Sequence, residues 1–166
     1  MSDSTKILDK TQLEQKLNRL AWQIYERNYK EKQIVVVGIA DRGVILADRI
    51  SKIISEISDI KITKATISLD KDSPFSEIVN LSIREKEFEN KVIILVDDVL
   101  NSGKTLMYAS KQFLLVPVKK LSTVVLVNRN HNRFPVKADY EGLSLSTTLH
   151  EYINVVFGKE EGVYLS

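Results

Sequence analysis

Residues 92–105 read Val-Ile-Ile-Leu-Val-Asp-Asp-Val-Leu-Asn-Ser-Gly-Lys-Thr, and this stretch decides the fold. Its first five side chains are branched and apolar, a run typical of a strand buried on both faces of a parallel sheet. Asp97 and Asp98 follow directly, so we expect both carboxylates at the carboxyl end of that strand. Ligands of open α/β sheets bind at this edge. The stretch therefore predicts a buried strand and a binding site together.

A loop of mostly small residues, 101–105, follows the carboxylates and opens a predicted helix. Successive backbone N–H groups in such a loop can converge on one anion, and the positive end of the helix adds to the attraction. Asp97 and Asp98 would repel a phosphate, so we expect them to face hydrogen-bond donors such as sugar hydroxyls, or a metal ion. A sugar phosphate meets both requirements.

Other interpretations of this stretch were weighed. The Gly-Lys-Thr ending at 103–105 imitates a P-loop, but Asp98 stands where that motif needs a glycine. The apolar run with its acids also imitates the magnesium-binding strand of a nucleoside triphosphatase, which requires an upstream phosphate loop. Asp97, Asp98 and Asn101 can also serve only as a strand-to-helix connection, although the complete fourteen-residue pattern favours a ligand site.

The composition favours one domain spanning residues 1–166. Apolar residues make up 43% of the chain in short runs, enough to form a core but not to span a membrane. With no signal-peptide pattern, we expect a cytoplasmic protein without a membrane partner. The chain has no cysteine and only two histidines, which excludes disulfides and sulfur-ligated zinc. A net charge of +2 is weak evidence for a nucleic-acid partner.

Apolar periodicity predicts strands that alternate with helices. Leucines and Ile24 recur at three- and four-residue steps in a helix at about 10–29, with Thr11 and Glu14 as its capping box. Further apolar runs predict strands at 34–37, 62–69, 92–96 and 121–127, and helices at about 44–57 and 105–115. This alternation predicts an α/β fold, doubly wound, with a mainly parallel sheet and helices on both faces.

The stretch Val-Asp-Asp-Val-Leu-Asn-Ser-Gly-Lys-Thr at 96–105 closely resembles the phosphoribosyl-diphosphate (PRPP) signature of the type I phosphoribosyltransferases. The resemblance implies that the two aspartates bind the ribose hydroxyls, that residues 101–105 hold the 5-phosphate, and that Mg²⁺ binds with PRPP. The aspartates would contact the metal directly, through water or through the ribose hydroxyls. The implied PRPP-binding residues are Asp97, Asp98, Val99, Leu100, Asn101, Ser102, Gly103, Lys104 and Thr105.

Other segments resemble the bacterial uracil phosphoribosyltransferase family that doubles as a pyrimidine-operon attenuator. They lie at 20–28, 37–44 and 134–142, and the similarity runs from about residue 10 onwards. This resemblance implies transfer of ribose 5-phosphate from PRPP to a nucleobase nitrogen, with uracil expected. An RNA-binding regulator with reduced or no catalysis, and a purine-type phosphoribosyltransferase, remain alternatives.

The same resemblance assigns the diphosphate to a loop of Asp41, Arg42 and Gly43. Gly43 would allow close backbone approach and Arg42 would supply charge. This lineage typically has a hydroxyl residue at the position of Asp41. The carboxylate of Asp41 would be unfavourable beside a diphosphate. It would turn away, contact magnesium or, as the preferred interpretation, cap the next helix.

Residues 70–82 resemble the lid that closes over PRPP in this superfamily. Lys71-Asp72-Ser73 stands where the attenuator lineage has Arg-Asp-Asp, so Lys71 is the expected catalytic residue of the lid and a weaker clamp than arginine. Closure would keep water from the reacting carbon. An ordinary exposed loop remains the alternative.

The resemblance also implies a small hood over the nucleobase, expected at about 128–150. Asn101 stands where 6-oxopurine enzymes carry an aspartate that handles the purine N7 proton. An amide cannot accept a proton at neutral pH, which favours a pyrimidine. The candidate hood residues are Arg129, Phe134, Asp139 and Tyr140.

Two macromolecular partners are considered. Attenuator homologues bind messenger RNA, and Arg19 and Arg27 lie on the matching N-terminal helix. Arg133, from a later segment, can add to the same RNA-binding surface. The modest charge and Trp22, in place of a usual histidine, count against RNA binding. Trp22 can instead anchor a subunit contact, so we expect a homodimer.

Overall fold

The structure is a computed structural model that describes residues 4–70, 72, 73, 75 and 79–166. Its centre is a six-stranded sheet of order β4-β3-β2-β5-β6-β7, parallel at every pairing except β3 with β4. The strands are β2 (Gln33–Ile39), β3 (Lys61–Ser68), β4 (Asn80–Leu81), β5 (Val92–Leu100), β6 (Lys120–Asn128) and β7 (Tyr140–Ser144).

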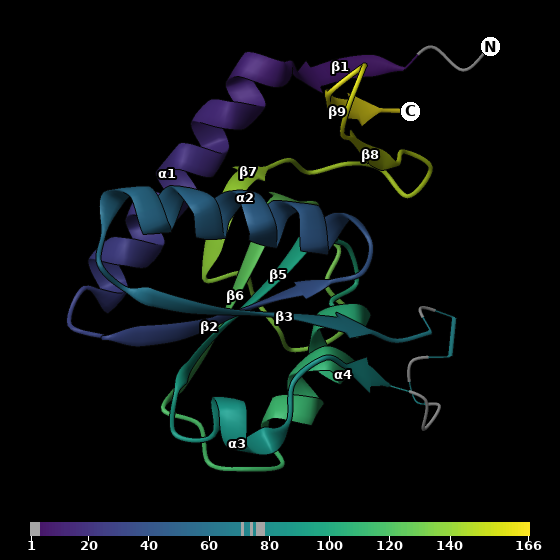
Figure 1. Cartoon of the computed structure of the whole chain (residues 1–166). Coiled ribbons are helices and arrows are strands. Elements are labelled where there is room, and N and C mark those ends of the chain that lie inside the picture. The colour runs from purple at the N-terminus through teal and green to yellow at the C-terminus, as the bar shows by residue number, and fades with distance from the viewer. Residues whose placement is uncertain (1–3, 71, 74, 76–78) are drawn as a thin grey trace.

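Helices cover both faces of this sheet, as Figure 1 shows. The helices are α1 (Lys10–Asn28), α2 (Arg42–Ile57), α3 (Glu85–Phe88) and α4 (Lys104–Phe113). Val36 and Ile94 belong to the core under α1 and α2, whereas Val35 and Leu95 belong to the core under α3 and α4. Alternate residues of a strand point to opposite faces, so each central strand contributes to both cores. The predicted doubly wound α/β fold is confirmed.

A second, antiparallel sheet joins the two ends of the chain. Its strands are β1 (Thr5–Leu8), β8 (Ile153–Val156) and β9 (Gly162–Leu165), in the order β1-β9-β8. The segment predicted as a hood, 128–150, contains β7, which adds a parallel strand to the central sheet beside β6. The sequence analysis missed β1, β4, β7, β8, β9 and α3, since short strands carry little apolar periodicity.

Helix α1 begins where it was predicted, but with a different capping box. Asp9 is the N-cap: its Oδ1 accepts a hydrogen bond from the Gln12 N–H at 2.8 Å, and Gln12 Oε1 accepts one from the Asp9 N–H at 2.9 Å. The predicted pair of Thr11 and Glu14 was therefore wrong. Aspartate is among the best N-caps, and glutamine at the third helical position completes the box as well as glutamate does.

Strand β5 is longer than its apolar run predicted. It continues from Val96 to Leu100 because its ladder with β6 continues as far as the pairing of Leu100 with Asn128. Asp97 and Asp98 consequently lie within the last part of the strand and not after it. The partner strand supplied the hydrogen bonds that the local sequence pattern did not reveal.

The chain order of the strands reverses between β2 and β5. From β2 the chain crosses to β3 on one side, and it later returns to β5 on the other side. The connections that leave the carboxyl ends of these two strands therefore diverge, which opens a crevice at the switch point. The 40–43 turn lies beside β5, since Gly38 pairs with Val96. None of the described helices has the length and apolar character needed to cross a bilayer.

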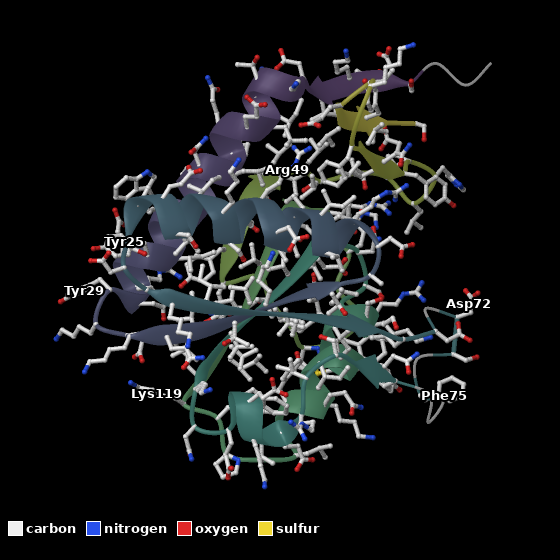
Figure 2. The ribbon with its side chains drawn as sticks, in the orientation of Figure 1. Tyr25, Tyr29, Arg49, Asp72, Phe75 and Lys119 are labelled. Atoms are coloured by element: carbon white, nitrogen blue, oxygen red, sulfur yellow. The ribbon has the colours of Figure 1, made fainter. Side chains whose placement is uncertain are left out.

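A partly buried ion pair ties α2 to the C-terminal strands. Arg49 donates from Nη1 to Glu161 Oε1 at 2.6 Å and from Nη2 to Glu161 Oε2 at 2.8 Å (Figure 2). The Glu161 side chain is only 4% exposed. The hydrogen bonds from Arg49 hold the pKa of Glu161 below its usual range and raise the pKa of Arg49. The two-pronged geometry is that of a strong carboxylate–guanidinium pair.

Replacing Glu161 should show how much this ion pair stabilises the fold. We expect Glu161→Gln to lower the free energy of unfolding by about 2 kcal/mol near neutral pH, because the guanidinium loses its charge partner. The pKa of Glu161 is lowered on folding, so the contribution is complete above the ordinary glutamate pKa and is lost as the pH falls through the folded value. Urea unfolding at about pH 7 and about pH 3 measures the difference.

The exposed neighbour Glu160 provides the control. Glu160→Gln should leave the unfolding free energy nearly unchanged at both pH values, because its carboxylate is solvated. If Glu161→Gln behaved as Glu160→Gln does, or if its cost did not shrink in acid, the stabilising role of the ion pair would be refuted.

Candidate functional site

The loop after β5 forms a small cavity at the beginning of α4. The cavity measures about 40 Å³ and is lined by Asp97 and residues 99–106. Gly103 has φ +86° and immediately precedes the first residue of α4. Backbone N–H groups at a helix N-terminus, arranged around a cavity, form an anion-binding nest. The five residues predicted to hold a phosphate thus surround one cavity.

The shape of this nest depends on a distant segment. The Ser102 carbonyl oxygen accepts hydrogen bonds from the N–H groups of Arg133 at 2.8 Å and Phe134 at 3.0 Å. A Cβ atom on Gly103 would lie 2.5 Å from Cγ1 of Val136. Ser102 Oγ also accepts a hydrogen bond from the Lys104 N–H at 3.2 Å. Residues 133–136 therefore hold the loop from outside, which the local motif did not predict.

Asp97 and Asp98 have different neighbours near the end of β5. Asp97 lines the nest cavity, and its Oδ1 accepts a hydrogen bond from the Asp98 N–H at 2.9 Å. Asp98 Oδ2 lies 3.7 Å from Nη1 of Arg42. The residues are only 4% and 8% exposed. Both carboxylates have polar contacts and do not point into an apolar core.

The predicted diphosphate loop lies beside this strand. The peptide bond between Ala40 and Asp41 is cis, and a Cβ atom on Gly43 would lie 2.6 Å from the Val96 carbonyl oxygen. Gly43 therefore allows the start of α2 to approach the backbone of β5 closely. Arg42 is the first residue of α2 and is half exposed. This placement brings one cation to the same edge as both aspartates.

The preferred interpretation of Asp41, that its side chain caps α2, was wrong. Asp41 occupies the N-cap position, but its side chain makes no capping hydrogen bond. Its backbone has φ −100° and ψ −39°, which is helical, whereas a capping residue normally has an extended backbone that aims its side chain at the next turns. The exposed carboxylate is left at the mouth of the crevice.

A larger cleft adjoins the nest on the side of the predicted hood. It measures about 630 Å³ and is lined by Asn101, Ser102, residues 129–133 and residues 147–149. Asn101 and Ser102 line both this cleft and the nest cavity, so the two spaces share a wall. A phosphate-sized cavity and a ring-sized cleft on either side of one loop fit a ligand with a phosphate at one end and a flat ring at the other.

Of the four predicted hood residues, Arg129 lies in the wall of the cleft. Phe134 packs against Tyr108, with ring centroids 6.2 Å apart, and Asp139 accepts a hydrogen bond from the Thr123 N–H at 2.9 Å. Tyr140 is 3% exposed, and this burial raises the pKa of its hydroxyl. The structure thus brings Arg129 to the nest but places Phe134, Asp139 and Tyr140 in packing and sheet contacts.

Residues 147–149 lie within the predicted hood, 128–150, but none of them was named as a candidate hood residue. Leu149 is 76% exposed and lines the cleft beside Thr147 and Thr148. These residues lie in an irregular segment after β7, without a motif or apolar periodicity, so no local signal could identify them. Only the exposed leucine in an otherwise polar stretch hinted at a contact surface.

The predicted lid is described in part. Lys71, the expected catalytic lysine, lies outside the described residues, as do 74 and 76–78. Asp70 Oδ1 accepts hydrogen bonds from the N–H groups of Asp72 at 2.9 Å and Ser73 at 3.2 Å. Figure 2 shows Asp72 and Phe75 beyond the carboxyl end of β3. The described part of the segment therefore lies at the edge of the sheet that carries the site.

Comparison with known proteins identifies the family. The family model described as a phosphoribosyl transferase domain matches residues 3–161. The chain belongs to this family. The resemblance read from residues 96–105 is thus confirmed, including its attenuator branch.

Similar proteins in the family support this assignment. The bifunctional protein PyrR of Clostridium acetobutylicum is 37% identical over 162 residues, covering 93% of this chain and 91% of that protein. The bifunctional protein PyrR of Fusobacterium nucleatum is 33% identical over 171 residues, covering 96% of each. The recurring name agrees with the branch that the sequence predicted.

Solved structures share the fold. A hypoxanthine-guanine phosphoribosyltransferase from Bacillus anthracis superposes with a TM-score of 0.70 at 22% identity, covering 84% of this chain and 81% of that one. The hypoxanthine phosphoribosyltransferase of Trypanosoma cruzi superposes with a TM-score of 0.74 at 14% identity, covering 90% and 84%. At these identities the likeness concerns the fold alone.

The nest can be tested through its glycine. We expect Gly103→Ala to weaken the binding of ribose 5-phosphate at least about tenfold, because the new methyl group clashes with Val136 and displaces the N–H groups of the loop. Titration calorimetry measures the affinity, and circular dichroism verifies the fold.

Gly158→Ala is the matched control, since Gly158 also has a positive φ, +103°, but nothing lies within 4 Å of the added Cβ. It should carry a similar backbone cost and leave the affinity unchanged. Equal affinities for wild type and Gly103→Ala would contradict the assignment of the nest.

Proposed function

We propose that this phosphoribosyltransferase transfers ribose 5-phosphate from PRPP to uracil and releases diphosphate, as in nucleotide salvage. The observation that carries the proposal is the shared wall of the nest and the cleft, with Asp97 lining the nest. A nucleotide has the matching shape, with a phosphate, a diol and a flat ring in sequence. Residues 101–105 would hold the 5-phosphate, and the base would occupy the cleft.

The residues of the chain have defined roles in this reaction. Asp97 and Asp98 would accept hydrogen bonds from the ribose hydroxyls, while Arg42 and the backbone of Gly43 would face the diphosphate. The bond between ribose C1′ and the diphosphate oxygen breaks, and its electron pair leaves with the diphosphate. The N1 lone pair of uracil forms the new bond to C1′, and the N1 proton passes to solvent. Lys71 and the rest of 70–82 would close over this centre and exclude water.

Magnesium fits this site as a partner of PRPP. No group of three or more side chains able to hold a metal occurs among the residues that the structure describes. Mg²⁺ commonly needs only one or two carboxylates when substrate oxygens and water supply its other ligands, and Asp97 and Asp98 offer the required hard oxygens. When bound, the ion would neutralise charge on the departing diphosphate. Asp41, exposed at the mouth of the crevice, is a further carboxylate at this edge.

The preference for uracil is supported by Asn101. This amide cannot take up a proton, whereas a purine reacting through N9 must lose its N7 proton. Uracil needs less general-base assistance, so electrostatic stabilisation by the site would be the main catalytic contribution. A purine-type enzyme remains the alternative within the same family.

Steady-state assays decide between the bases. With PRPP and magnesium, we expect robust turnover of uracil and little of hypoxanthine or guanine. Asp97→Asn should lower kcat/KM for uracil by about 100-fold. The variant replaces a carboxylate oxygen, which accepts a hydrogen bond from a ribose hydroxyl, by an NH₂ group, which can only donate. Asp59→Asn serves as the control, because Asp59 is exposed and lies outside the proposed site, and it should leave kcat/KM nearly unchanged. Turnover of a purine without turnover of uracil would overturn the assignment.

The alternative function is RNA-dependent regulation of a pyrimidine operon. Its predicted residues on α1 already have partners: Arg19 donates to the carbonyl oxygens of Glu141 and Gly142, and Arg27 donates to that of Asp139. These hydrogen bonds dock α1 against β7 and reduce the cationic surface that α1 offers to a phosphate backbone. The contacts therefore support the enzyme over the regulator.

Filter binding against salt concentration tests the regulator. We expect affinity for pyrimidine-operon leader RNA no stronger than for random RNA of the same length, with a shallow dependence on salt. Tight, sequence-selective binding with a steep salt dependence would establish messenger RNA as a partner. Arg19→Gln would then separate two roles of Arg19, docking α1 against β7 and contacting an RNA phosphate. A loss of RNA affinity without a loss of protein stability would require a direct phosphate contact.

We also infer a single domain over residues 1–166, a cytoplasmic location and a homodimer. The lack of cysteine suits a reducing compartment. Trp22 is 47% exposed, and its ring centroid lies 6.0 Å from that of Tyr25 in an edge-on arrangement. Tyr29, directly after α1, is 59% exposed, and Figure 2 shows it on the same side of the molecule as Tyr25. Exposed aromatic side chains of this kind commonly anchor subunit contacts.

A further inference from the structure

The guanidinium of Arg129 connects the nest loop to the far wall of the cleft. It donates from Nη1 to Asn101 Oδ1 at 2.8 Å and from Nε to Thr147 Oγ1 at 2.9 Å. From Nη2 it donates to the carbonyl oxygens of Thr148 at 3.3 Å and Glu151 at 2.6 Å. Arg129 is only 7% exposed, so this network is shielded from solvent. One side chain thereby holds the phosphate loop and residues 147–151 in a fixed relation.

The network determines which way the Asn101 amide points. Arginine has only donors, so the atom of Asn101 that faces it must be the carbonyl oxygen Oδ1. The amide NH₂ group, Nδ2, is therefore directed away from Arg129. Within the described part of the chain, Nδ2 has no hydrogen-bond partner, and Asn101 is exposed in the wall of the cleft. Asn101 therefore carries a pair of N–H donors on an exposed side chain that lines the cleft.

We propose that Arg129 is a positioning residue that orients the Asn101 amide, so that its N–H donors select a base edge that carries a hydrogen-bond acceptor. The proposal rests on the function proposed above, because it places the base in this cleft. Uracil presents two carbonyl oxygens, which accept. A purine that reacts through N9 presents an N7–H donor, which would leave two donors facing each other without an acceptor.

Arginine is required here because of its shape. The planar guanidinium provides five donors in fixed directions, and four acceptors on two segments use them. A lysine would supply a single flexible ammonium group that cannot hold Asn101 and the 147–151 segment together. Arg129→Lys therefore keeps the charge and removes the geometric constraint.

The test compares the affinities of uridine monophosphate and ribose 5-phosphate by calorimetry. Asn101→Asp keeps an acceptor for Arg129 but replaces the NH₂ group by an oxygen, so it should weaken uridine monophosphate binding about tenfold or more. Asn101 also lies in the phosphate loop, where a new carboxylate repels the phosphate of both ligands, so we expect the loss for uridine monophosphate to exceed the loss for ribose 5-phosphate by about tenfold. A merely structural or charge effect would lower both affinities by the same factor.

Asn130→Asp controls for the added negative charge. Asn130 lines the same cleft, but its Nδ2 already donates to Ser144 Oγ at 2.9 Å. A serine hydroxyl can donate to a carboxylate instead, so this variant should leave uridine monophosphate affinity within about threefold of wild type. A loss equal to that of Asn101→Asp would assign the effect to charge and overturn the proposal.

The double variant tests the link through Arg129. Arg129→Lys alone should weaken uridine monophosphate binding about tenfold, and Asn101→Asp should then cost little more, because the amide is no longer oriented. Additive losses would overturn the positioning role. If wild type binds ribose 5-phosphate but Asn101→Asp leaves uridine monophosphate affinity unchanged, this inference fails and the proposed function stands. If wild type binds neither ligand, both fail.

Discussion

The parallel ladder between β2 and β5 is the constraint on which the site depends. It places the carboxyl ends of two strands, more than fifty residues apart in the chain, at one edge of the sheet. Gly43 permits this contact, because any side chain there would collide with the Val96 carbonyl oxygen. The ladder brings the start of α2, with Arg42, beside the aspartates of β5. Without this ladder, the 40–43 turn and the nest would be unrelated loops.

The site concentrates charge where burial makes it costly. Asp97 and Asp98 are adjacent and almost completely buried, and burying a carboxylate is unfavourable unless it has partners. The structure reduces this cost by placing Arg42 near Asp98 and by directing the Asp98 N–H to Oδ1 of Asp97. Ionisable side chains that are removed from water in this way are typical of functional sites. The arrangement is consistent with a site in which a bound ligand further offsets the desolvation cost of the two carboxylates.

Contacts from later in the chain complete what the motif begins. Residues 133–136 hold the loop through the Ser102 carbonyl group, and Arg129 holds it through Asn101. The nest and the cleft are consequently parts of one hydrogen-bonded unit. This coupling gives a physical reason why a phosphoribosyltransferase of this type would recognise both ends of a nucleotide together.

The sequence by itself determined the sheet strands with strong apolar runs, the helices with three- and four-residue periodicity, and the nest of residues 101–105, because these features arise from local patterns. Only the tertiary structure decided how far β5 extends, since a neighbouring strand supplies the hydrogen bonds past Val96. It also decided that Tyr140 is a core residue and that residues 147–149 line the cleft. Short strands and irregular segments acquire their positions from partners distant in the chain, and no local periodicity encodes those partners.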